Sequence, residues 1–211
     1  MKAINNRLFA PLAVVAVALA FATDAAAQSR YDRVHFNIGW QMNSPFSGGF
    51  ADKLSGWGMA FEGDYDLTER WSAGAFFNFH TNHKYVGRQT LPVGGTGALT
   101  TDQQRSYFQL PFGVAGNYVL WDNAHFRPYV GVKAGAMYAK ATTYYGTGGV
   151  YDKSWGFYVS PEVGAAIYPA AGKRFGFRIT GYYSYATNET ATLTSPIDGQ
   201  SNAGFRVGVI F

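Results

Sequence analysis

The side chains best suited to catalysis or metal binding are the four histidines and the acids and hydroxyls near them in the chain. His80 and His83 have an i, i+3 spacing, which on a strand sends two side chains to opposite faces and makes a shared metal site unfavourable. His83, Asp102 and Ser106 have the side-chain types of a nucleophilic hydrolase, and a hairpin could bring them together. The sequence supports neither arrangement further. We therefore expect no catalytic residue, no metal site and no cofactor.

Two glycine clusters, Gly94-Gly-Thr-Gly97 and Gly146-Thr-Gly-Gly149, resemble phosphate-binding loops only in composition. A nucleotide-binding loop joins a strand to a helix, and neither cluster is placed to do so. They are predicted to be the tips of long connections.

A third set of reactive side chains consists of isolated charges, each opposite an apolar face in the alternation described below. Its members are Glu62, Lys133, Glu162, Arg178 and Arg206. If the apolar faces share one side of a sheet, these charges meet on the other side, where an unpaired charge would be costly. We expect a structural network of ion pairs. The alternative is a small gated pore whose ion pairs switch.

The elements that must position these residues are eight segments in which apolar and polar residues alternate, as in strands buried on one face. The predicted strands cover 34–42, 57–65, 71–80, 108–118, 126–138, 155–167, 175–185 and 202–211. Short turns at 66–70, 121–125 and 169–173 alternate with long connections at 43–55, 81–104, 140–154 and 186–200. Pro111 and Pro161 are predicted to mark β-bulges, because proline cannot donate a ladder hydrogen bond.

The apolar faces carry no charge and end in aromatic side chains. These are Trp57, Tyr65, Trp71, Tyr118, Tyr138, Trp155, Tyr183 and Tyr185. An outward apolar band, aromatic girdles and turns of unequal length are typical of transmembrane β-barrels. The fold class is therefore predicted as all-β: an eight-stranded antiparallel up-and-down transmembrane barrel, closed by pairing the last strand with the first. A soluble, exported lipocalin-like binder is the alternative. The glycine-rich polar face favours the narrow interior of a membrane barrel.

Composition and the N-terminus agree with export. Aromatics make up 18% of the chain, there are 26 glycines and no cysteine, and the net charge is only +4, which does not indicate a nucleic-acid partner. Lys2 and Arg7, the apolar run 8–22 and Ala25-Ala-Ala27 together form a signal-peptide pattern. We expect a cleavable signal peptide over residues 1–27 and one barrel domain over 28–211.

The barrel pattern is accompanied by short motifs at the strand ends. They are Tyr65-Asp-Leu-Thr-Glu-Arg-Trp71, Gln109-Leu-Pro-Phe112, Arg127-Pro-Tyr-Val-Gly131 and the terminal Phe211. With them the chain resembles the small eight-stranded outer-membrane barrels of Gram-negative bacteria, a class that includes the OmpA transmembrane domain, OmpX and the opacity adhesins. The resemblance implies location in the cell outer membrane, with outer-membrane lipid and lipopolysaccharide as surroundings.

In that family the C-terminal strand resembles a signal read by the barrel-assembly machinery, here carried by Phe205, Val207, Val209 and Phe211. Arg206 stands where an internal glycine is usual. Some barrels of this class modify lipid A, but the late-strand His-x-Ser pattern of the deacylases is absent.

The long connections are where binding to a host or surface ligand would reside. Candidate contact residues are Lys84, Tyr85, Arg88, Tyr144, Tyr145, Tyr151 and Lys153. The sequence therefore predicts a non-enzymatic outer-membrane barrel with a structural or adhesin-like role. A small pore, a lipid A-modifying enzyme and a soluble binder remain the alternatives.

Overall fold

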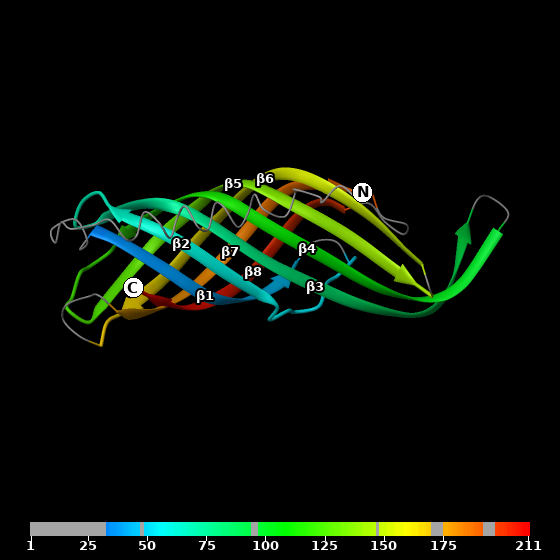
Figure 1. Ribbon diagram of the computed structural model, residues 1–211, viewed down its shortest axis with the longest axis horizontal. Coiled ribbons are helices and arrows are strands. Elements are labelled where there is room, and N and C mark those ends of the chain that lie inside the picture. Colours follow the sequence, from blue (N-terminus) through cyan, green and yellow to red (C-terminus); the bar gives the residue numbers. More distant parts are fainter. Residues whose placement is uncertain (1–32, 47–48, 94–96, 147, 170–174, 192–196) are drawn as a thin grey trace, which may run out of the picture. The chain divides into compact units, whose positions relative to one another are not determined.

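A computed structural model describes residues 33–46, 49–93, 97–146, 148–169, 175–191 and 197–211. The strands are β1 (Val34–Pro45), β2 (Gly58–Asp66), β3 (Trp71–Val93), β4 (Gly97–Val119), β5 (Phe126–Tyr145), β6 (Gly148–Ile167), β7 (Gly176–Thr190) and β8 (Ile197–Ile210). They form one closed barrel in chain order (Figure 1). The predicted fold class is confirmed.

The seam of the barrel joins the first and last strands. β1 and β8 pair antiparallel from Asn37 opposite Ile210 to Pro45 opposite Asn202. Two further hydrogen bonds, 2.8 and 2.9 Å long, join the backbones of Phe36 and Phe211. Closure leaves no open strand edge, which a bilayer could not hydrate.

Side chains alternate between the lumen and the outer wall as predicted. On β7 every second residue from Gly176 to Thr190 is buried, while the outward residues between them are exposed. The predicted girdle residues lie on the outer wall, where Trp71 stacks near Tyr118 (centroids 4.9 Å apart) and Tyr138 near Trp155 (5.2 Å). These two pairs lie near opposite ends of the apolar band.

The long connections differ from expectation, because most of their residues continue the ladder. β3 and β4 pair out to Val93 and Gly97, and β5 and β6 pair out to Tyr145 and Gly148. Figure 1 shows the β3–β4 hairpin continuing past the ends of the other strands. A strand of 23 residues far exceeds the roughly 9–11 needed to cross a bilayer. The predicted loop 81–104 is thus mainly a two-stranded sheet, since pairing satisfies its backbone donors and acceptors.

The predicted bulges at Pro111 and Pro161 are wrong. The registers on either side of each proline are continuous, and the irregularities fall between Val86 and Gln89 and between Ala186 and Glu189 instead. Pro161 would face Tyr183 across the ladder, and the Ser160 hydroxyl donates to the Tyr183 carbonyl at 2.8 Å. A neighbouring side chain thus replaces the missing backbone donor without a change of register.

No helix among the described residues is long and apolar enough to cross a membrane. The signal peptide predicted for residues 1–27 lies outside the described residues and stays a prediction.

Two glycines let the barrel wall accommodate an aromatic pair. Gly113 and Gly135 are direct partners on β4 and β5, flanked in the same row by Phe76 and Tyr158. The rings of Phe76 and Tyr158 approach to 5.8 Å between centroids across the lumen. A Cβ on Gly135 would overlap the carbonyl oxygen of Phe112.

We expect Gly135→Val to destabilise the barrel by about 1–3 kcal/mol, because the added side chain overpacks this row. The folded fraction in detergent, read from heat-dependent gel mobility, checks this. Gly116→Ala is the matched control, since nothing lies within 4 Å of the position of its Cβ. Equal folded fractions for the two variants would contradict the close-approach explanation.

Candidate functional site

The five charges predicted to share the lumen come together inside the barrel. Glu162 on β6 is the centre, with Arg206 Nη1 at 2.7 Å, Lys133 Nζ at 3.2 Å and Arg178 Nη2 at 3.4 Å from its carboxylate oxygens. Its side chain is fully buried. Three cations from β5, β7 and β8 therefore compensate one acid that has no access to water.

A second acid, Glu62 on β2, ties the opposite wall to the same cations. Its carboxylate lies 2.5 Å from Lys133 Nζ and 3.1 Å from Arg178 Nη1. Asp64, also on β2, lies 3.1 Å from Arg178 Nη1. Three acids thus face three bases. Sequence reasoning left Asp64 out of the network, although its position two residues after Glu62 on the same face was a sufficient signal.

Neutral side chains satisfy part of the hydrogen-bonding capacity that the ion pairs leave over, while Arg206 Nη2 has no partner in the described chain. Arg178 stacks on Tyr129 (4.3 Å to the ring centroid) and donates from Nε to its hydroxyl at 2.6 Å. Arg206 stacks on Tyr182 at 3.9 Å and donates to Gln41 Oε1 at 2.9 Å. Such contacts offset part of the cost of removing charges from water. Because these side chains come from six strands, the charge layer ties opposite walls of the barrel together.

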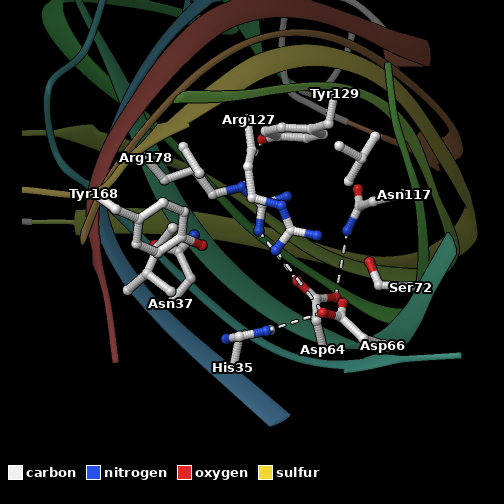
Figure 2. A pocket seen from close by; sticks show the side chains of 13 residues that line it. His35, Asn37, Asp64, Asp66, Ser72, Asn117, Arg127, Tyr129, Tyr168 and Arg178 are labelled. Atoms are coloured by element: carbon white, nitrogen blue, oxygen red, sulfur yellow. Dashed lines mark hydrogen bonds and ion pairs between the residues drawn. The ribbon is translucent and has the colours of Figure 1, made fainter. Parts of the chain in front are cut away.

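A small cavity adjoins this layer at the end that carries the short turns. It has a volume of about 60 Å³ and is lined by both luminal and turn-proximal polar groups. Figure 2 shows Arg127 and Arg178 directed toward Asp64 and Asp66, with His35 beside Asp66 at 3.1 Å. Drug-sized ligands need roughly 300–1,000 Å³. The cavity has room for water molecules but not for a substrate.

The outer end of the lumen is filled by amides and closed by a cap, residues 49–55 of the β1–β2 connection. Asn43 donates to Asn82 at 2.9 Å, and Asn202 to Gln109 at 3.1 Å. Above them Phe50, only 2% exposed, sits edge-on to Tyr107 with centroids 6.4 Å apart. An aromatic side chain thus closes the mouth over a hydrogen-bonded amide layer.

Lys84, predicted as a loop contact, holds this cap in place. Its ammonium donates to the Gly49 carbonyl at 2.8 Å and pairs with Asp52 at 2.7 Å. The hydrogen bond and charge of Lys84 lower the pKa of Asp52 below its ordinary value, so the pair stays ionised at neutral pH and is lost only in acid.

The histidines do not assemble a reactive site. His80 points into the lumen against Gln41, 3.0 Å away, while exposed His83 lies on the outer face. His83 and Ser106 are direct cross-strand partners, but Asp102 accepts from the Tyr85 hydroxyl at 3.2 Å. No hydrogen bond joins His83, Ser106 and Asp102 in the described chain. Among the described residues no group of three or more His, Cys, Asp or Glu could hold a metal ion.

The remaining predicted contact residues lie on the hairpins. Tyr85, Gln104 and Tyr144 are successive partners across β3, β4 and β5 on the outer face, and we call them the tyrosine row. Arg88 is exposed within the β3 irregularity between Val86 and Gln89. Tyr145 is half-buried beside Tyr144, whereas Tyr151 and Lys153 are exposed on β6.

The sequence model described as "Outer membrane protein beta-barrel domain" matches residues 13–211, most of the chain. The chain belongs to this family. It is therefore an integral protein of the cell outer membrane, and outer-membrane lipid surrounds its wall. In barrels of this kind the short turns face the periplasm and the long connections face outward.

Several solved structures are similar to the chain at low sequence identity. The attachment invasion locus protein Ail of Yersinia pestis has a TM-score of 0.45 and 15% identity, covering 85% of this chain and 98% of its own. Neisserial surface protein A has a TM-score of 0.46 and 13% identity over 84% and 94%. OprG of Pseudomonas aeruginosa has a TM-score of 0.43 and 12% identity over 84% and 94%. Comparison with curated proteins finds no match.

Glu162→Gln is expected to lower the free energy of unfolding by about 3–5 kcal/mol, because it leaves three buried cations short of one acid. Urea unfolding in lipid or detergent, followed by tryptophan fluorescence, measures the change. Glu69→Gln, in the exposed β2–β3 turn, is the control and should change stability by less than about 0.5 kcal/mol. A loss no larger than that of the control would show that the charge layer does not hold the barrel together.

Proposed function

We propose that this barrel binds a surface partner through the outer face of its extended hairpins and performs no catalysis. The tyrosine row carries the proposal. Tyr85 and Tyr144 are 62% and 53% exposed. Tyrosines on a paired sheet bring a large apolar area to an interface at little entropic cost. Strands lie about 4.8 Å apart, so the backbones of Tyr85 and Tyr144 lie about 10 Å from each other with Gln104 between them.

The ladder beneath this row makes it a rigid platform. Lys84 pairs with Arg105, Tyr85 with Gln104 and Val86 with Gln103, so β3 is paired with β4 before, at and after Tyr85. A preorganised surface loses less conformational entropy on binding than a free loop does. The tyrosine row suits a host or bacterial surface macromolecule that offers polar and aromatic groups for contact.

The absence of catalysis is proposed because no hydrogen bond joins His83, Asp102 and Ser106 among the described residues, where Asp102 accepts from Tyr85 instead, and because the luminal cavity is small. We also propose that the barrel-assembly machinery reads the C-terminal strand. Phe205 and Phe211 support this, because in the closed barrel their rings stand 5.6 and 6.2 Å from those of Trp40 and Phe36 at the seam.

The surface role predicts that Tyr85→Ser/Tyr144→Ser lowers the adhesion of a non-adherent bacterial host producing the barrel to epithelial monolayers by about tenfold or more, a loss typical of aromatic contact residues. The readout is the number of bound bacteria at equal surface expression. Tyr145→Ser, which alters the neighbouring half-buried tyrosine, is the control. Undiminished adhesion by the double variant, or no adhesion by the unaltered barrel, contradicts the proposal.

The pore alternative makes a separate prediction. Because the charge layer, the Phe76–Tyr158 pair and the cap all occupy the lumen, planar bilayers containing the protein should show no sustained channel openings. Phe50→Gly alone should not open a channel, since the charge layer and the Phe76–Tyr158 pair still fill the lumen. Sustained openings that disappear in Glu62→Gln or Arg178→Gln would favour a gated pore instead.

A further inference from the structure

The outer wall of β5 and β6 carries a pair of lysines directly above the aromatic girdle. Along this ladder Ala136 faces Phe157, Tyr138 faces Trp155, and Lys140 faces Lys153 one step further out. Interfacial aromatics mark the boundary of the hydrocarbon region. The two ammonium groups therefore lie at the level of the lipid headgroups.

Two like charges directly opposite each other destabilise a sheet, so this pair needs compensation. Within the described chain no ion pair involves either lysine. Asp152, the nearest acid in sequence, accepts from the backbone N–H groups of Lys153 (2.8 Å) and Ala191 (2.7 Å). The described part of the chain thus supplies no ion-pair partner for Lys140 or Lys153.

An aromatic ring holds both ammonium groups at one place. Tyr151 lies 4.8 Å from Lys140 Nζ and 5.5 Å from Lys153 Nζ, measured to its ring centroid. Cation–π contacts of this kind orient the two charges without neutralising them. The result is a localised site of charge +2 that can accept an anion from outside the barrel.

We propose that Lys140, Lys153 and Tyr151 bind the phosphate of a phosphorylated lipid headgroup in the outer leaflet. The position of the site selects a lipid over a free anion. Phe108 is the direct partner of Lys140 on β4, and Leu110 is the partner of Tyr138, so apolar side chains continue from the site toward the bilayer core. A ligand whose phosphate contacts the lysines and whose acyl chains contact the apolar side chains would match both the charged and the apolar part of the site. Free phosphate would meet only the charged part.

The test is a binding titration by native mass spectrometry on the purified, folded barrel in detergent. Its probes are bisphosphorylated lipid A, dephosphorylated lipid A and inorganic phosphate. A lysine near a membrane surface contributes roughly fivefold in affinity, so Lys140→Gln/Lys153→Gln should weaken binding of bisphosphorylated lipid A by about 25-fold. Tyr151→Leu should weaken it less, because both charges remain.

Lys53→Gln is the control, since Lys53 is exposed on the β1–β2 connection, where its carbonyl accepts from Asn82 on β3. All variants should keep the heat-dependent gel mobility of the unaltered protein, because the changed side chains face outward. Weaker binding of dephosphorylated lipid A to the unaltered barrel is also expected. The proposal is overturned by equal affinities of the double variant and the unaltered barrel, by an equal loss in the control, or by inorganic phosphate competing as well as the lipid. None of these results depends on the tyrosine row, so the adhesion proposal and the lipid-binding proposal can be refuted independently.

Discussion

Every other feature of this protein depends on a backbone ladder that closes on itself. A bilayer offers no water to unpaired N–H and C=O groups, so a sheet can cross it only without an edge. The pairing of β1 with β8 removes the edge, and the aromatic contacts of Phe205 and Phe211 with Trp40 and Phe36 cover that seam on the lipid side. Closure also creates the narrow lumen. The inward side chains must then fill that space and satisfy one another.

The lumen meets this demand in layers of different chemistry. Glu62, Asp64 and Glu162 pair with Lys133, Arg178 and Arg206. Phe76 and Tyr158 occupy the space that Gly113 and Gly135 leave free. Each layer draws on several strands. A buried ion pair contributes little net stability against an apolar pair of equal volume, yet losing one partner is costly. The layer therefore favours the native register over alternatives that would separate charges.

Much of this could be predicted from the sequence, because alternation with period two assigns both the strand and the face of each residue. That rule placed Glu62, Lys133 and Glu162 in the lumen. It did not reveal that 81–104 is largely paired, since the segment is rich in glycine and threonine and lacks the apolar alternation that lipid imposes. It also could not find the cap, because Phe50 lies in an irregular segment. Pro161 was misread because the neighbouring Ser160 hydroxyl can substitute for a backbone donor.

These constraints also determine where the protein can recognise other molecules. Within the described residues the charge layer pairs its acids with its bases, and the cap closes the outer end, so the interior offers no space for a drug-sized ligand. The surfaces that remain available for binding lie on the outside of the β3–β6 wall, at two different heights above the membrane core. Lys140 and Lys153, which have no ion-pair partner among the described residues, lie at headgroup level, and the tyrosine row lies further out on the same sheet. Because one ladder carries both, a lipid held by the lysines would fix the depth of the barrel in the membrane and hence the height of the tyrosine row above it.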